Sequence, residues 1–201
     1  MRLTGTVVAA HGRQYGIELI DGETLPCVPR GKKGELVCGD RVIVERTGAR
    51  QGVITSLEPR RTLLYRSDHR KQKLIAANVT QIVVVVATEP AFSDELVTRC
   101  IVAAESQEIG ILIVLNKCDL RERLSTASAA LAPYEKLGYR VIPLCALRDS
   151  APLRPYLADH VSVLIGQSGM GKSTLINALI PDARAATREI SHALHTGKHT
   201  T

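Results

Sequence analysis

The chain has 201 residues, 45% of them hydrophobic but only 3% aromatic, which supplies an aliphatic core and argues against a nucleic-acid surface built on aromatic stacking. Its five cysteines form no C-x-x-C pair, and no apolar run approaches the ~20 residues that span a bilayer; a zinc knuckle, a disulfide framework and a membrane segment are therefore disfavoured, and the cytoplasm is predicted. The net charge is +6, and the excess lies in residues 1–75, with 14 Lys and Arg against 8 Asp and Glu, which suggests a polyanionic partner, although a solvated basic surface is the alternative.

Residues 1–62 are predicted to form a small all-β barrel. Short apolar runs alternate with Gly, Pro and the hairpin signal Asp21-Gly22, and turns recur about every ten residues. About five short strands with basic loops fit an OB-like barrel, and Arg30, Lys32 and Lys33 are candidate RNA contacts. An SH3-type barrel without a nucleic-acid role is the alternative.

The segment 63–78 is predicted to be a linker or a basic contact arm. Its central stretch, RSDHRKQK, has a single Asp among its basic residues. Arg70, Lys71 and Lys73 are therefore further candidate RNA contacts. Most basic runs of this kind are simply solvated, and that interpretation stays open.

From residue 79 onward, buried strands alternate with helices. Strands are predicted at 81–87, 111–115, 140–144 and 160–166. Helices are predicted at 93–109, 122–138, 151–159 and 172–180. The β-branched run QIVVVVA at 81–87 indicates a strand buried on both faces, Ser93 is a plausible N-cap, and Pro133 should interrupt or kink its helix. The alternation predicts an α/β domain over 79–201, with a mainly parallel sheet.

The strand at 111–115 leads into Asn116-Lys117-Cys118-Asp119, which fits the guanine-reading pattern N-K-x-D. A buried carboxylate at Asp119 can accept from N1–H and the 2-amino group of guanine, whereas adenine would leave it unsatisfied. Asn116 is expected to fix the loop and touch the base, and the stem of Lys117 to cover the ring. A polar strand end is the alternative, but the carboxyl edge of a parallel sheet beside a phosphate loop favours guanine binding.

The next strand leads into Cys145-Ala146-Leu147, in the place of a base-backing loop of the form S-A-[KL]. A backbone N–H here could meet O6 of guanine. Cys145 replaces the Ser of that pattern, so the signal is weak, and an ordinary strand-to-loop exit is the alternative.

Residues 166–174, GQSGMGKST, fit the phosphate-loop pattern G-x-x-x-x-G-K-[ST] between a predicted strand and a predicted helix. Backbone N–H groups of such a loop surround phosphates at a helix N-terminus. Lys172 would reach the β- and γ-phosphates and Ser173 would bind Mg²⁺; a Gly-rich turn with a surface lysine is the alternative. The residues predicted to contact GTP or GDP are Asn116, Lys117, Cys118, Asp119, Cys145, Ala146, Leu147, Gly166, Gln167, Ser168, Gly169, Met170, Gly171, Lys172, Ser173 and Thr174.

The tail TREISHALHTGKHTT (187–201) has no clear helical or strand period and is interpreted as a switch loop. Thr200 and Thr201 are predicted Mg²⁺ ligands. His199 could position the attacking water, and it joins Lys172 as a catalytic candidate. A metal site made by the three histidines of the tail and a plain disordered tail are the alternatives.

In this chain the base-reading motif precedes the phosphate loop, whereas ordinary GTPases have the phosphate loop first, so the order indicates a circular permutation. With its basic barrel, NKCDL, GQSGMGKST and GKHTT, the chain resembles the ribosome small-subunit-dependent GTPase A family over essentially its whole length. The resemblance implies an OB-fold followed by a permuted GTPase domain. It also implies late binding to the small (30S) ribosomal subunit and its 16S rRNA, and GTP hydrolysis to GDP that the subunit stimulates.

That family continues into a D-x-P-G segment and a zinc-binding domain, and neither is in the printed sequence. The chain is therefore expected to be truncated, to hold no zinc and to hydrolyse GTP poorly, because the missing Asp would hold Mg²⁺ through water. A cytoplasmic monomer is expected. Two other classes stay open: a GTP-dependent RNA-binding module with incidental turnover, and a P-loop ATPase with a coincidental N-K-x-D.

Overall fold

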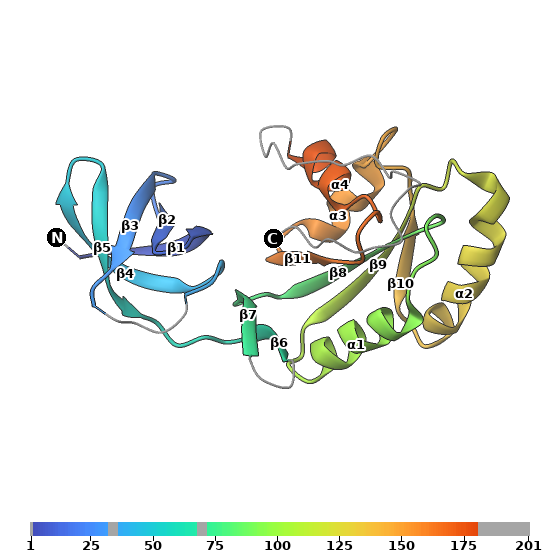
Figure 1. Cartoon of the computed structure of the whole chain (residues 1–201), viewed down its shortest axis with the longest axis horizontal. Coiled ribbons are helices and arrows are strands. Elements are labelled where there is room, and N and C mark those ends of the chain that lie inside the picture. Colours follow the sequence, from blue (N-terminus) through green and yellow to red (C-terminus); the bar gives the residue numbers. More distant parts are fainter. Residues whose placement is uncertain (1, 32–35, 68–71, 181–201) are drawn as a thin grey trace. The chain divides into compact units, whose positions relative to one another are not determined.

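The computed structural model describes residues 2–31, 36–67 and 72–180 (Figure 1). The chain divides into two compact units. The first unit comprises residues 1–81, 103–110 and 159–163, and the second unit comprises residues 82–102, 111–158 and 164–201.

The first five strands close into a barrel. They are β1 Arg2–His11, β2 Gln14–Leu19, β3 Thr24–Pro29, β4 Arg41–Gly48 and β5 Gln51–Leu57. Their order is β1-β2-β3-β5-β4, and β4 pairs back onto β1, which confirms the predicted OB-like barrel. Side chains alternate along the strands, so that Ile17, Val42 and Ile54 are fully buried in an aliphatic core. The Asp21-Gly22 signal is also confirmed, because Gly22 has a φ of +83° in the β2–β3 turn.

The basic segment after the barrel contains two strands that the sequence pattern did not predict. Strand β6, Leu63–Ser67, pairs antiparallel with β7, Gln72–Ala77. Its first residue, Leu63, is also held by Gln107, which accepts from the Leu63 N–H at 2.8 Å and donates to its carbonyl at 3.1 Å. Only Leu64, Ala76 and Ala77 of the described residues in this hairpin are buried, so the apolar pattern is too short to reveal strands.

Within the first unit, the turn before β4 is hydrogen-bonded to the residues that precede β6 and to the residue that follows β7. The buried carboxylate of Asp40 accepts from Arg60 Nε at 2.7 Å and Nη2 at 2.9 Å. Asn78 donates to the Gly39 carbonyl at 2.8 Å and accepts from Arg61 N–H at 2.9 Å. Gly39 has a φ of +91°, and a Cβ there would collide with the Ala77 carbonyl, so this position requires glycine.

The α/β part contains a sheet in the order β10-β9-β8-β11. Its strands are β8 Gln81–Ala87, β9 Gly110–Asn116, β10 Arg140–Pro143 and β11 Ser162–Ile165. All seven residues of β8 are buried, as the β-branched run predicts, and β9 and β10 pair in parallel. The helices are α1 Asp94–Glu105, α2 Leu124–Lys136, α3 Arg154–Leu157 and α4 Lys172–Leu179, and two 3₁₀ turns, Arg121–Arg123 and Ala151–Leu153, precede α2 and α3.

Two helix predictions differ from the structure in detail. Helix α2 is not interrupted at Pro133, so that alternative of the prediction was wrong; the proline lies in the last turn of the helix and forfeits a single backbone hydrogen bond. The helix predicted at 151–159 is a 3₁₀ turn followed by four α-helical residues. Figure 1 shows α1 on one face of the sheet and α4 on the other.

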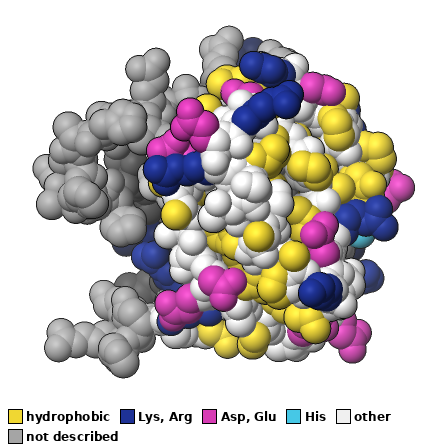
Figure 2. Space-filling model, turned by 90° about the vertical axis from the view of Figure 1, so that its right-hand side faces the viewer, with side chains coloured by type: hydrophobic (Ala, Val, Ile, Leu, Met, Phe, Trp, Pro, Cys, Tyr) yellow, Lys and Arg dark blue, Asp and Glu magenta, His cyan; other side chains and the backbone are white. Residues whose placement is uncertain are grey.

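The surface of the α/β part carries charges of both signs. Residues 76–201 contain 12 Lys and Arg and 12 Asp and Glu. Figure 2, which views the side at the right of Figure 1, shows hydrophobic, acidic and basic side chains interspersed on this face. This face therefore offers no field of a single sign to a polyanion.

Candidate nucleotide-binding site

The loop Gly166–Gly171 joins β11 to α4, and two of its glycines lie where a Cβ would not fit. A Cβ on Gly166 would collide with the Val85 carbonyl of β8, and a Cβ on Gly171 would collide with Asn116 Nδ2. Gly169 and Gly171 also have φ values of +83° and +86°, which L-residues rarely adopt. The loop backbone therefore runs close against both β8 and the base-reading motif.

Helix α4 begins at Lys172, directly after the loop. Gly171 caps it without a side-chain hydrogen bond, so the N–H groups of the first turn stay available to an anion. Lys172 Nζ donates to the carbonyls of Gly166 and Gln167, both at 2.7 Å. Burial lowers the pKa of the Lys172 ammonium, while Ser173 and Thr174 are half-buried beside it.

Asn116, at the end of β9, is bonded to all three predicted motifs. Its side chain is 2% exposed. Nδ2 donates to the Met170 carbonyl of the phosphate loop at 3.0 Å. Oδ1 accepts from Ala146 N–H at 2.9 Å and from Lys117 N–H at 2.8 Å. The structure therefore brings together loops that lie up to 54 residues apart in the chain.

Lys117 and Asp119 follow in the same loop. Lys117 has a φ of +61°, its Nζ donates to the Glu89 carbonyl at 2.8 Å, and burial lowers its pKa. Asp119 is exposed, which corrects the expectation of a buried carboxylate, because it lies in the turn beyond the end of β9. The pKa of Asp119 is lowered, and the largest cause is a hydrogen bond with the Cys145 side chain. The cysteine that replaces Ser in the base-backing loop is therefore still a partner of this carboxylate.

The base-backing loop itself is only partly as expected. The Ala146 N–H, a candidate for guanine O6, is engaged by Asn116. The Leu147 side chain is 82% exposed. Cys118, between Lys117 and Asp119, donates its N–H to the Leu144 carbonyl at 3.2 Å and so joins the two loops.

A segment that the sequence motifs did not reveal contacts both nucleotide motifs. We call residues 88–93, TEPAFS, the strap; it runs from the end of β8 to the start of α1. Thr88 donates its hydroxyl to the Lys117 carbonyl at 2.9 Å and its N–H to the Asn116 carbonyl at 3.1 Å. Ser93 N–H donates to Gln167 Oε1 at 2.6 Å. The one signal in this segment was Ser93 as N-cap, and its Oγ does accept from Leu96 N–H at 3.3 Å.

Several predicted residues lie outside the described part of the chain. They are His199, Thr200, Thr201, Lys32, Lys33, Arg70 and Lys71. Of the other candidate RNA contacts, Arg30 pairs with Glu45 at 3.7 Å, and Lys73 is exposed opposite Arg66 in the β6–β7 hairpin. Among the described residues, no cluster of three or more His, Cys, Asp or Glu could hold a metal ion. No helix among them has the length and apolar character needed to cross a membrane.

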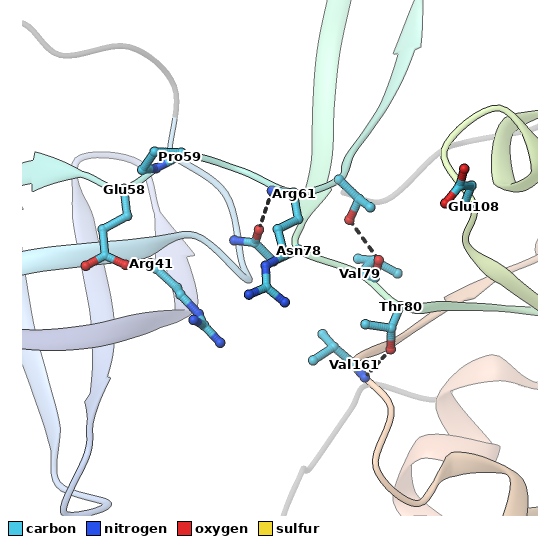
Figure 3. Close-up of a pocket in the computed structure, with 10 residues that line it drawn as sticks. Arg41, Glu58, Pro59, Arg61, Asn78, Val79, Thr80, Glu108 and Val161 are labelled. Carbon is cyan, nitrogen blue, oxygen red and sulfur yellow. Dashed lines mark hydrogen bonds between the residues drawn. The ribbon is translucent and has the colours of Figure 1, made fainter.

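A cavity of about 390 Å³ lies in the first unit, apart from these motifs (Figure 3). Figure 3 shows the side chains of Arg41 and Arg61 extending into it. Glu58 and Glu108 also line it, so two carboxylates offset two guanidinium groups.

Comparisons with known proteins agree with this arrangement. The sequence profile of the RsgA GTPase family matches residues 57–201. The small ribosomal subunit biogenesis GTPase RsgA of Nitrosospira multiformis is 54% identical over 199 residues, which cover 99% of this chain and 64% of that protein. The protein of the same description from Burkholderia pseudomallei is 55% identical over 205 residues, which cover all of this chain and 65% of that protein. The chain thus spans slightly less than two thirds of these relatives.

Two solved structures share the fold. YjeQ from Thermotoga maritima superposes with a TM-score of 0.72 at 30% identity, covering 90% of this chain and 66% of that one. YloQ, described as a circularly permuted GTPase, superposes with a TM-score of 0.68 at 27% identity, covering 92% and 66% of the two chains. The permuted order of motifs predicted from the sequence is therefore confirmed at the level of the fold.

Proposed function

Because this chain belongs to the RsgA GTPase family, we propose that it binds GTP and GDP at the loops around Asn116 and acts in late maturation of the small (30S) ribosomal subunit. Its longer relatives carry the description small ribosomal subunit biogenesis GTPase. The proposed reaction is hydrolysis of GTP to GDP and phosphate, stimulated by the subunit. We place this work in the cytoplasm and assign it to a monomer that contacts 16S rRNA.

The observation that carries the proposal is the position of Asn116. Its buried amide bonds the base-reading loop, the base-backing loop and the phosphate loop at once. Two alternatives account for less of this geometry. A polar strand end does not explain the hydrogen bond to the phosphate loop, and an adenine-specific site does not explain the Asp119 carboxylate, because adenine offers it no matching pair of donors. The three loops thus fit one guanine nucleotide, with its base at Asp119 and its phosphates at the start of α4.

The residues present also fit the cofactor that such a reaction uses. Ser173 follows Lys172 at the N-terminus of α4, where an Mg²⁺ ion bound to the β- and γ-phosphates would meet its hydroxyl. Lys172 is drawn onto two carbonyls by short hydrogen bonds, and phosphate oxygens would replace those acceptors. Thr200 and Thr201 are the proposed additional Mg²⁺ ligands, and His199 is proposed to position water. Mg²⁺ would neutralise the charge that develops on the transferred phosphoryl group.

We assign the barrel at 1–62, the connecting hairpin at 63–78 and the nucleotide domain at 79–201 as the functional parts. The basic excess lies in the first two parts, which are proposed to contact rRNA, with Arg30 and Lys73 as the described candidates. Zinc has no proposed site in this chain.

The proposal is tested by nucleotide competition and by turnover. GDP should displace a fluorescent guanine nucleotide from this chain, and ADP should fail to do so even at 100-fold excess. Small subunits should accelerate GTP turnover by the complete protein. Displacement by ADP would favour a P-loop ATPase. Guanine binding without stimulation by the subunit would favour the alternative function, a GTP-dependent RNA-binding module with incidental turnover.

Charge neutralisation tests the RNA surface. Changing Lys32, Lys33, Arg70 and Lys71 to Gln should weaken RNA binding and flatten its salt dependence, because the slope of log K against log[salt] falls by about 0.7–0.9 for each phosphate that is no longer neutralised. The matched control is Arg46→Gln, because Arg46 is already paired with Glu23. Affinity measured at a series of salt concentrations gives the slope; a slope equal to that of the unmodified chain would place the RNA contact elsewhere.

A further inference from the structure

We propose that Gln167 is a positioning residue of the nucleotide site, because its side chain ties the phosphate loop to the strap (residues 88–93) and through it to the base-reading loop. The inference rests on the proposed function. It assigns a role to one of the four positions that the phosphate-loop pattern leaves open.

The contact that carries it joins residues 74 apart in the chain. Gln167 Oε1 accepts from the Ser93 N–H at 2.6 Å. Ser93 is the N-cap of α1, since its Oγ accepts from Leu96 N–H. The N–H of an N-cap residue has no acceptor within its own helix, and Gln167 supplies one from the phosphate loop.

The other end of the strap is held by the base-reading loop. Thr88 bonds the carbonyls of Asn116 and Lys117, and Lys117 Nζ bonds the Glu89 carbonyl. Next to Ser93, Phe92 packs against the core cluster that includes Val85 and Met170. The strap is thus held at both ends. A residue that is hydrogen-bonded to the strap is therefore connected through it to the base-reading loop.

The phosphate loop has different fastenings on its two sides. Asn116 holds its second half at Met170, and Gln167 holds its first half at Ser93. Lys172 also contacts the first half, but that ammonium must turn to the phosphates when a nucleotide binds. Gln167 is therefore the side chain that keeps the N–H groups of residues 166–168 in register with a bound phosphate.

A role in positioning predicts a particular kinetic signature. Loss of the Gln167 anchor weakens ground state and transition state alike, so KM for GTP should rise while kcat changes little. GDP should dissociate faster by about 2- to 10-fold, the usual worth of one neutral hydrogen bond.

The test is a double-mutant cycle on the dissociation of fluorescent GDP from the full chain. Gln167→Met keeps the length of an exposed side chain and removes the acceptor. Ser93→Pro removes the donor, whereas Ser93→Ala keeps the N–H and removes only the cap oxygen. Gln167→Met should accelerate GDP release in the unmodified chain and in the Ser93→Ala background by the same factor. In the Ser93→Pro background it should have no further effect.

Two outcomes would overturn the inference while leaving guanine binding intact. One is a Gln167→Met variant that releases GDP at the original rate. The other is an equal acceleration in the Ser93→Pro and Ser93→Ala backgrounds, which would show that Gln167 acts without the Ser93 N–H. Thermal unfolding of each variant identifies any general loss of fold, and Gln167→Met alone decides the matter if Ser93→Pro does not fold. A chain that binds no GDP would instead overturn the proposed function, and this inference with it.

Discussion

Replacing Asp119 by Asn should exchange the preference for guanine for a preference for xanthine. The carboxylate offers two acceptors to N1–H and the 2-amino group of guanine, whereas an amide offers one acceptor and one donor. One of the two charge-assisted hydrogen bonds is lost, the 2-amino group of guanine then faces a donor, and the remaining bond becomes a neutral one, so GDP binding should weaken by about 10²–10⁴-fold. Xanthine carries an oxygen at position 2, so the NH₂ group of the new amide gains a partner and XDP binding should rise.

The Asp119→Asn experiment separates base recognition from folding. Asp119 is exposed and lies in a turn, so its replacement should leave the thermal stability of the chain almost unchanged. Asp159→Asn is a matched control, because Asp159 is an exposed carboxylate outside the motifs and its φ of +61° suits Asn. Competition of GDP and XDP with a fluorescent nucleotide gives both affinities. An Asp119→Asn variant with unaltered GDP affinity would show that another group reads the base.

Gly171→Ala should lose both stability and nucleotide binding. The new Cβ collides with Asn116 Nδ2, whose hydrogen bond to the Met170 carbonyl holds the phosphate loop. The backbone at Gly171, with a φ of +86°, is also unfavourable for alanine. Overpacking and backbone strain together should lower the free energy of unfolding by about 2–5 kcal/mol. GDP affinity should fall by at least about tenfold, because the loss of a single hydrogen bond between the loop backbone and a charged phosphate oxygen already has that size.

Gly138→Ala is the control that measures the effect of backbone strain alone, without a collision. Gly138, after the end of α2, has a φ of +94°, but an added Cβ would meet nothing within 4 Å. The free energy of unfolding of this variant should fall by only about 1–2 kcal/mol, and its affinity for GDP should be unchanged. Urea unfolding and GDP titration of the two variants check the comparison. Equal losses in both variants would mean that the approach of Gly171 to Asn116 has no part in holding the site.

The motifs and the strands that carry them were predictable because their patterns are local. The run at 81–87 indicates a doubly buried strand, and β8 has those bounds. The order of N-K-x-D and phosphate loop indicates the permutation without any coordinates. Even the role of Asn116 in fixing a loop follows from its place at the carboxyl end of a parallel strand.

The strap and the hairpin were not predictable for a common reason. The contact between Ser93 and Gln167 uses a backbone N–H as its donor. Every residue except proline has such a donor, so the residue type at position 93 does not reveal the contact. The β6–β7 hairpin buries too few side chains for a strand period, and much of its anchorage uses backbone groups such as those of Leu63. The exposure of Asp119 was likewise hidden, because motif matching gives the identity of a residue and says nothing about the depth at which its loop lies.

The order of the motifs also has a consequence for how the site forms during synthesis of the chain. During synthesis at about 5–20 residues per second, the 53 residues from Asp119 to Lys172 take roughly 3–10 s to appear. At the start of that interval the nascent chain contains the N-K-x-D residues, but the base-backing loop at 145–147 and the phosphate loop at 166–171 have not yet been made. The amide of Asn116 lacks its Met170 acceptor until that loop has been made, so we expect the proposed affinity for a guanine nucleotide to arise only when β11 and the phosphate loop are in place. The last described strand to be made is the one that closes the site.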